Sequence, residues 1–277
     1  MALASSFLFL QRRLEATFPI SKNIGIKNNH CIRTYKLSFP FHSIKNILKH
    51  KSENEELREI PNSICKLPTL QTLMFQDCAQ IEELPRDIRH MVGLRMLTIT
   101  TKQSFLPENG IGSLNSLRYL AIIGCQNLQY LPQGIHLLSS LRTLLIRDCD
   151  KLIKLPRSVK YLLMLEKLVI VNCKMLQLNT NAEMKGNADD HQDYLIGSGL
   201  SLHQLWIARV EKLEFLPQWL IRSAKTLLHL HIEDCPKLKT LPKWFQNLKS
   251  LEKLEILKCP LLSTSGGEED KYGDRFN

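Results

Sequence analysis

The cysteines of this 277-residue sequence recur at a regular position, which raises the question of thiolate chemistry. Six of the eight follow one pattern of leucines and isoleucines, namely Cys78, Cys125, Cys149, Cys173, Cys235 and Cys259. Such a row could hold a soft metal ion or a chain of disulfides. Parallel strands in register, however, would not make the Cβ atoms converge as a disulfide requires. We therefore interpret the row as structural, with buried thiols that behave as small apolar groups and bond to backbone groups.

A second candidate group alternates along one expected strand, where His229, His231 and Glu233 share the outward face. At strand rise, Glu233 lies about 13 Å from His229, so at most two of the three could meet one ion. The next strand adds Lys253 and Glu255, a pair of opposite charge. We predict a polar patch that faces solvent here, and no metal site.

Motifs of common catalytic machinery do not occur in the sequence. There is no G-x-x-x-x-G-K-[ST] phosphate loop, and the dipeptide Gly-Lys never occurs. G-x-S-x-G, H-E-x-x-H and C-x-x-C do not occur either. We predict a protein that is not an enzyme and uses no cofactor.

The elements that position these residues come from an eightfold repeat of the form L-x-x-L-x-L-x-x-C. Its middle leucines are Leu73, Leu97, Leu120, Leu144, Leu168, Leu205, Leu230 and Leu254. The intervals between them are 24, 23, 24, 24, 37, 25 and 24 residues. Leucine-rich repeats span about 20–29 residues, so only one interval is anomalous. Each L-x-L turns two side chains inward, and neighbouring coils must stack to bury them.

A Leu-Pro or Ile-Pro pair punctuates the segment between successive strands, as in Leu131-Pro132. Proline fixes φ and cannot donate to a strand ladder, so it suits the start of a return segment. Apolar residues three apart follow, such as Ile135 and Leu138, which favour a short helical or 3₁₀ turn. The predicted fold is an α/β leucine-rich-repeat solenoid. We expect a curved horseshoe with a parallel sheet on its concave face and short helices or 3₁₀ turns on its convex face.

The predicted organisation has a basic N-terminal segment over 1–51, a repeat domain over 52–262 and a disordered tail over 263–277. The long interval contains an inserted loop at 177–199, rich in Asn, Asp and Gly. Such composition cannot bury a core, so we expect a surface loop.

Positive charge is concentrated in residues 1–51, which hold nine Lys and Arg against Glu15 alone. This composition is compatible with an organelle transit sequence, with a truncated or wrongly assigned start, or with a degenerate first repeat in which Ile32, Tyr35 and Leu37 allow a strand. The rest of the chain carries a net charge of only +2. We therefore expect no nucleic-acid partner.

Apolar runs in the chain are too short for a membrane span, which needs roughly 18–20 residues. The longest run, 1–10, has neither the charged flank nor the cleavage site of a secretory signal. Asn-x-Ser/Thr acceptors do not occur, and the cysteine pattern does not fit a disulfide scaffold. These features predict a cytoplasmic protein, with organelle targeting through the basic N-terminus as the lesser alternative.

The predicted concave face is unusually apolar in its middle coils and polar toward its ends. Its candidate partner-binding residues are Ala121, Ile123, Leu145, Arg147, Val169, Val171, Trp206, His231 and Glu233. An exposed apolar patch with a polar rim is typical of a protein-binding site, and Trp and Arg are common anchors. The alternative is that these residues merely favour strand conformation. If the patch is exposed, replacing Trp206 and Leu145 by Asp should abolish partner binding and leave the fold intact.

Two segments, 106–132 and 216–262, closely resemble the repeat domain of plant nucleotide-binding leucine-rich-repeat disease resistance proteins of the coiled-coil class. The shared features are L-x-x-L-P, a strand followed by Cys, and the Cys-Pro pairs at Cys235 and Cys259. The resemblance covers roughly 57–262 and implies an intracellular immune receptor domain whose protein partner is a pathogen effector or a nucleotide-binding receptor domain. The coiled coil and nucleotide-binding module of that family do not occur in this sequence. Two alternatives remain open: a signalling scaffold of the Ras-associated leucine-rich-repeat type, and a nonfunctional truncated fragment.

Overall fold

A computed structural model of the chain describes the backbone of residues 20–22, 35–37 and 47–51, and residues 58–67, 69–76, 80–178 and 200–262 in full. The expected tail over 263–277 lies outside these residues, as does nearly all of the expected loop at 177–199.

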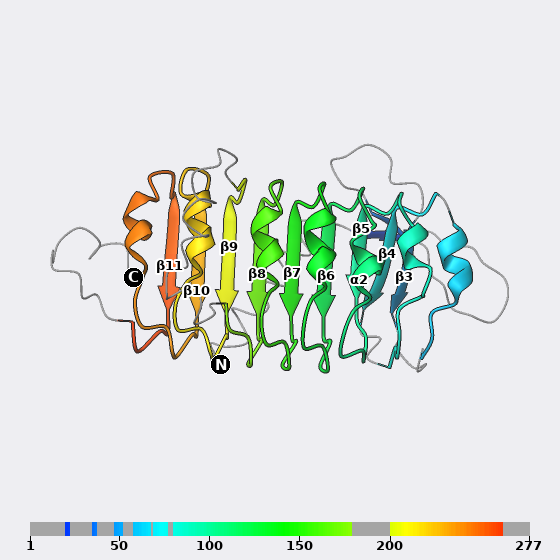
Figure 1. Cartoon of the computed structure of the whole chain (residues 1–277), viewed down its shortest axis with the longest axis horizontal. Helices are drawn as coiled ribbons and strands as arrows, with labels where there is room; N and C mark the ends of the chain where they lie inside the picture. Colours follow the sequence, from blue (N-terminus) through cyan, green and yellow to red (C-terminus); the bar gives the residue numbers. More distant parts are fainter. Residues whose placement is uncertain are drawn as a thin grey trace.

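One parallel sheet of nine strands runs the length of the molecule, with its strands in sequence order (Figure 1). The strands are β3 (Ile47–Lys51), β4 (Thr72–Gln76), β5 (Met96–Ile99), β6 (Tyr119–Ile123), β7 (Thr143–Arg147), β8 (Lys167–Val171), β9 (Gln204–Ala208), β10 (His229–Glu233) and β11 (Lys253–Leu257). Leu97, Leu120, Leu144 and Leu168 pair in register across β5 to β8. The predicted solenoid of stacked coils is therefore confirmed.

The sheet begins one strand earlier than the sequence pattern shows. Strand β3 pairs with β4, placing Leu48 opposite Leu73, and lies within the segment set apart as N-terminal. The degenerate strand suggested around Tyr35 exists as β2 (Tyr35–Leu37), but it pairs antiparallel with β1 (Ile20–Lys22) in a separate two-stranded sheet. One of its expected residues, Ile32, lies outside the described residues.

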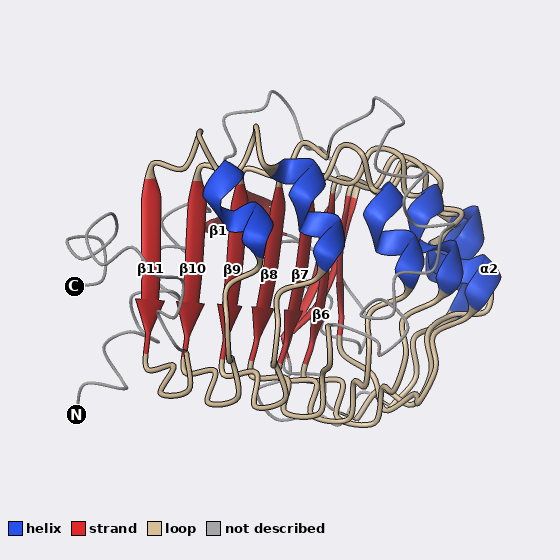
Figure 2. Ribbon diagram, turned by 60° about the vertical axis from the view of Figure 1, so that its left-hand side comes forward, coloured by secondary structure: helices blue, strands red, loops and turns tan. Residues whose placement is uncertain are grey.

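Short helices occupy the return segments on one side of the sheet (Figure 2). They are η1 (Asn62–Lys66), η2 (Ile88–His90), α2 (Glu108–Ile111), η3 (Gln133–Leu137), η4 (Arg157–Tyr161), η5 (Gln218–Ser223) and η6 (Lys243–Asn247). All except η2 begin directly after a proline whose φ lies between −58° and −68°. Proline thus starts these six turns without sacrificing a ladder hydrogen bond, as the sequence predicts.

Leucines and isoleucines from strands and turns form one continuous core between the sheet and the helices. Leu97, Leu144 and Ile146 are fully buried in it. Arg222 links the short helices on either side of the long interval. Its Nη1 donates a hydrogen bond to the Lys160 carbonyl at 3.3 Å and so joins η5 to η4.

The chain leaves the middle and last strands through a residue in the left-handed region. These residues are Gly124, Asp148, Asn172, Arg209, Asp234 and Lys258, with φ between 53° and 67°. In most of them the backbone N–H donates to the carbonyl that ends the next strand, as from Asp148 to Val171 at 3.0 Å. This turn directs the following residue, cysteine in most coils, into the core.

Candidate functional site

Side chains on the sheet surface opposite the helices form two rows across the strands. The inner row contains Ala121, Leu145, Val169, Trp206, His231 and Glu255. The end row contains Ile123, Arg147, Val171, Ala208, Glu233 and Leu257. All nine residues that the sequence assigned to a binding face therefore stand together on this surface, which we call the sheet face.

Much of the apolar part of the sheet face is buried, contrary to the sequence-based expectation of an exposed patch. Ala121, Leu145, Val169 and Val171 are between 0% and 7% exposed and belong to an apolar cluster separate from the main core. The expectation was wrong because it considered each strand alone. In the sheet, each of these side chains stands about 4.8 Å from neighbours on both sides. Larger partly buried residues, including Ile123 and Trp206, pack against the cluster.

This burial also corrects the expected effect of Leu145→Asp. A carboxylate at a position 3% exposed would lose its hydration without gaining a charged partner, so the substitution would destabilise the fold. The residues of the sheet face that keep partial or greater exposure are Ile123, Arg147, Trp206, Glu233, Glu255 and Leu257. At the margin of the cluster, burial raises the pKa of Tyr119 to about 12, so its phenol stays protonated.

An aromatic stack marks the transition from the apolar to the charged half of the sheet face. The rings of Trp206 and His231 lie with centroids 3.7 Å apart and planes at 27°. The two residues are direct neighbours in register on β9 and β10. Trp206 is half-buried against the apolar cluster, whereas His231 is 9% exposed. The stack therefore holds both rings in one orientation.

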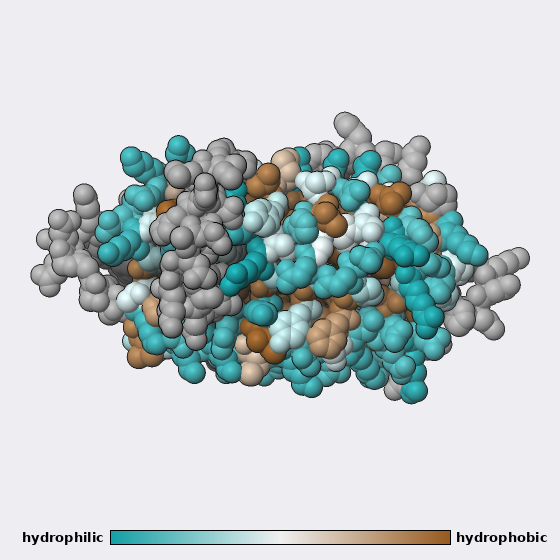
Figure 3. Space-filling view, in the orientation of Figure 1, coloured by the Kyte–Doolittle hydropathy of each residue, from teal (hydrophilic) through white to brown (hydrophobic). Residues whose placement is uncertain are grey.

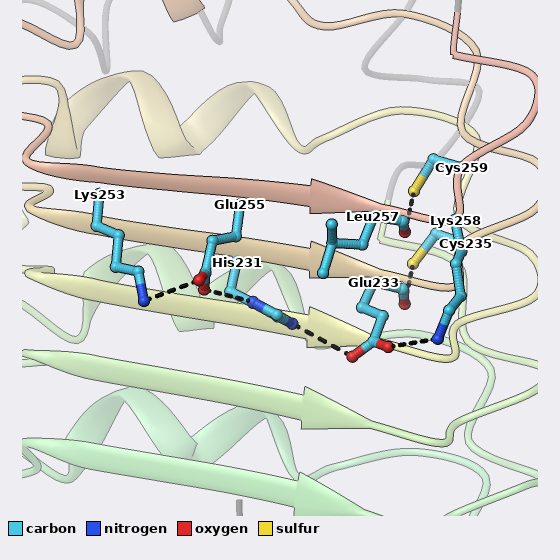
Figure 4. A network of polar contacts seen from close by, with 8 residues as sticks. All are labelled: His231, Glu233, Cys235, Lys253, Glu255, Leu257, Lys258 and Cys259. Carbon is cyan, nitrogen blue, oxygen red and sulfur yellow. Dashed lines mark hydrogen bonds and ion pairs between the residues drawn. The ribbon is translucent and has the colours of Figure 1, made fainter. Parts of the chain in front are cut away.

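His231 lies between two carboxylates that belong to a wider charged network (Figure 4). Its Nδ1 is 2.9 Å from Oε2 of Glu255, and its Nε2 is 3.5 Å from Oε2 of Glu233. Lys258 donates to Glu233 at 2.9 Å, and Lys253 pairs with Glu255 at 2.8 Å. Every charge in this group thus has a partner of opposite sign.

The two carboxylates of this network have lowered pKa values. Burial raises the pKa of Glu233, but the hydrogen bond and charge of Lys258 outweigh that effect. Burial likewise raises the pKa of Glu255, but hydrogen bonds from Lys253 and His231 outweigh it. Both groups are therefore ionised at neutral pH and balance the nearby lysines.

His229, His231 and Glu233, which the sequence analysis weighed as metal ligands, do not form one cluster. His229 instead pairs with Glu252, at 3.6 Å between Nε2 and Oε2. Among the described residues, no group of three or more His, Cys, Asp or Glu side chains could hold a metal ion.

Arg147 is held beside the end of the central strands. Its Nε lies 3.1 Å from Oδ2 of Asp148, whose other oxygen accepts a hydrogen bond from Asn172 at 2.7 Å. The Arg147 side chain keeps 24% of its surface exposed. A guanidinium positioned in this way can still meet a carboxylate from a partner.

The cysteines in the described part of the row have the structural environment that the sequence predicted. The thiols of Cys149, Cys173 and Cys235 donate to the carbonyl two residues earlier, at 3.3, 3.5 and 3.5 Å. All three are buried and free. Cys78 lies outside the described residues.

One member of the site was not found from the sequence. The position of Lys258 depends on a left-handed turn beyond the strand, so the alternation rule does not place its side chain. Ala208 follows the alternation of its strand on the same face as Trp206 and belongs to the buried cluster, although it is not among the residues assigned to partner binding.

The fold and sheet face define a solenoid repeat protein, in which each coil contacts mainly its neighbours and the strands present a broad surface. A family model described as a leucine-rich repeat region matches residues 48–233. The chain therefore belongs to the leucine-rich-repeat family. Domains of this family are in general non-catalytic protein-interaction modules.

The solved structure of another leucine-rich repeat domain has the same fold. The leucine-rich repeat domain of the type III effector XopL is 27% identical, with a TM-score of 0.61, over 79% of this chain and 71% of its own. The plant peptide hormone receptor RGFR1, solved in complex with RGF2, is 22% identical with a TM-score of 0.43. That match covers 72% of this chain and 34% of the receptor. A search of curated protein sequences finds no match.

The surface in the view of Figure 3 is a mosaic in which small hydrophobic patches alternate with hydrophilic side chains. Exposed large hydrophobic side chains include Leu137 in η3 and Tyr161 in η4. Within the described residues, no helix is both long and apolar enough to cross a membrane.

Proposed function

We propose that this chain is a non-catalytic interaction module of the plant defence response, which recognises a pathogen effector or regulates a nucleotide-binding immune receptor. The proposal rests on the resemblance of 106–132 and 216–262 to plant resistance proteins. In this proposal the chain acts in the cytoplasm, where both kinds of partner are met.

The observation that supports a binding role most directly is the composition of the accessible part of the sheet face. Trp206 and Arg147 stay partly exposed beside a buried apolar cluster, and both are held by contacts within the chain. Tryptophan and arginine in such settings are the most frequent anchors of protein interfaces. Because both side chains are already ordered, little conformational entropy is lost when a partner binds.

The charged network around His231 would form the polar rim of this interface. Its carboxylates and lysines lie at the C-terminal end of the sheet face, next to Trp206. A polar rim around an apolar centre matches the general anatomy of protein interfaces. The paired charges would contribute specificity more than affinity.

The test is binding of the purified chain to two probes. These are the purified nucleotide-binding domain of a coiled-coil plant resistance protein and an effector captured from infected plant tissue and then produced in pure form. We expect Trp206→Ala and Arg147→Ala each to weaken binding about tenfold or more. Leu137→Ala serves as the matched control. Leu137 is 54% exposed and lies in η3, on the helix side of the sheet and not on the sheet face.

Equal binding by wild type, Trp206→Ala and Arg147→Ala would remove the sheet face from the proposal. Recovery of chaperones alone from infected tissue, with no binding of the receptor domain, would support a nonfunctional fragment instead of a defence protein.

A further inference from the structure

Three arginines occupy the same position in successive coils, one residue before strands β5, β6 and β7. They are Arg95, Arg118 and Arg142. The Arg118 N–H donates to the Arg95 carbonyl at 2.8 Å, and the Arg142 N–H donates to the Arg118 carbonyl at 2.9 Å. Neighbouring segments in such a ladder lie about 4.8 Å apart, so the three side chains leave the backbone side by side. We call them the arginine row.

The arginine row is open to solvent. All three of its residues are exposed, and the Arg142 side chain keeps 49% of its surface accessible. Ser116 and Ser140 stand two residues before Arg118 and Arg142, and the alternation of an extended chain puts them on the same side. The guanidinium groups are therefore flanked by small polar side chains that leave them accessible.

Charged side chains in neighbouring coils commonly pair with an opposite charge elsewhere on this surface. Their partners are 24 or 25 residues away, one coil along, as in Lys174–Asp150, Lys239–Glu214, Lys258–Glu233 and Arg142–Glu166. The stacking of the coils thus gives many charges a counter-charge in register. The contact between Arg142 and Glu166 also shows that side chains in this row can reach their neighbours.

The arginine row departs from this pattern. Within the described part of the chain, neither Arg95 nor Arg118 forms a hydrogen bond or an ion pair through its side chain. Like charges side by side on neighbouring strands destabilise a folded chain. A glutamate in place of Arg118 would have had an arginine on each side. The needs of folding therefore do not explain the arginine at this position.

We propose that the arginine row is a docking site for an acidic helix of a protein partner. Carboxylates on successive turns of a helix have Cβ atoms about 5–6 Å apart, close to the spacing of about 4.8 Å between the coils. Each guanidinium can hold one carboxylate through two parallel hydrogen bonds. A row of three arginines thus fits one face of a helix that carries two or three carboxylates.

The ends of the arginine row favour such a helix over a nucleic acid. The same backbone ladder places Gln71 before Arg95 and Glu166 after Arg142, at 2.8 Å for each hydrogen bond. The positive stretch is therefore only about 10 Å long, because it spans two intervals between coils. A nucleic-acid backbone is recognised by a longer basic track, whereas a few carboxylates need no more than this.

The arginine row is separate from the sheet-face residues that are proposed to anchor a defence partner. Arg147 follows Arg142 by five residues along β7, a distance of about 16 Å at strand rise. The row lies where the strands start, and Arg147 lies where β7 ends. The inference therefore goes beyond the proposed function and does not depend on it.

The experiment measures binding of the whole chain to a labelled, alanine-rich helical peptide that carries glutamate at every fourth position. The same peptide with glutamine is the blank. We expect the wild type to bind only the glutamate peptide, and the affinity to fall as added salt screens the charges. Arg95→Gln/Arg118→Gln should weaken binding about tenfold or more. Equal binding of the two peptides by the wild type would sink the proposal.

A matched control separates the arginine row from net charge. Arg89→Gln/Arg157→Gln removes the same charge at two exposed positions outside the row, so its affinity should stay within about twofold of the wild type. An equal loss in both double variants would mean that only the total charge matters, against the proposal. Equally tight binding of a single-stranded oligonucleotide would reassign the row to nucleic acid. Self-association of the wild type that Arg95→Gln/Arg118→Gln abolishes would reassign it to a second copy of the chain.

Arg118→Glu separates docking from folding. The new carboxylate would lie between Arg95 and Arg142, so the urea midpoint of unfolding should stay unchanged or rise. Binding of the glutamate peptide should nevertheless weaken about tenfold or more, because the centre of the row then repels it. Retained binding, or a lower urea midpoint, would contradict the inference that Arg118 serves a partner and not the fold.

Discussion

The indole of Trp206 lies against the imidazole of His231, with ring centroids 3.7 Å apart, and this contact joins the apolar and charged halves of the sheet face. His231 continues the chain of contacts to Glu255 through a 2.9 Å hydrogen bond. One side chain from each of three successive strands is thereby held in place. A perturbation at Trp206 should therefore be felt two coils away.

The first prediction concerns the coupling of the two rings. Trp206→Ala and His231→Ala should each destabilise the chain, and their effects should not add. We expect a coupling free energy of about 0.5–1.5 kcal/mol, the usual contribution of an aromatic pair. Urea unfolding of the wild type, both single variants and the double variant measures it. Additive effects would show that the stack contributes nothing to stability.

The second prediction follows from the burial of the apolar cluster. Leu145→Asp should lower the free energy of unfolding by about 3 kcal/mol or more, because an unpaired carboxylate replaces a side chain that is 3% exposed. Leu145→Met nearly conserves volume and should cost less than about 1.5 kcal/mol. Urea midpoints for the two variants decide the matter. A stable Leu145→Asp variant would restore the exposed patch that the sequence suggested.

The third prediction is a pH dependence of stability. The pKa values of Glu233 and Glu255 are lowered in the folded chain from an ordinary value of 4.5. Their contribution to stability is therefore complete above that value and is lost as the pH falls through the folded pKa values. We expect Glu233→Gln/Glu255→Gln to lose less stability than the wild type between about pH 5 and pH 3. Urea unfolding across that range should show parallel curves if the two carboxylates play no part.

The fourth prediction compares a central coil with the last one. Leu144→Ala should cost about 2–5 kcal/mol, because Leu144 is fully buried and its loss leaves a cavity. Leu254→Ala, at the same position of the repeat, should cost less because Leu254 is only partly buried. Thermal or urea unfolding of both variants tests this. Equal costs would mean that the last coil is as tightly packed as the middle of the solenoid.

Local patterns were sufficient to predict the coil. The spacing of 23 or 24 residues between Leu97, Leu120, Leu144 and Leu168 predicted the register that the sheet shows. Prolines such as Pro132 correctly indicated where each short helix begins. Strand β3 was missed because its segment lacks the full L-x-x-L-x-L pattern, and only its pairing with β4 reveals it.

What the sequence determined by itself was the repeating unit, because a strand, a proline turn and an inward leucine are set by residues close to one another in the chain. The tertiary structure decided which outward residues are buried and which charged side chains pair. Ala121 and Leu145, or His231 and Glu255, are 24 residues apart and become neighbours only when the coils stack. Burial and charge pairing at such positions depend on the side chains of adjacent coils, which no single repeat contains.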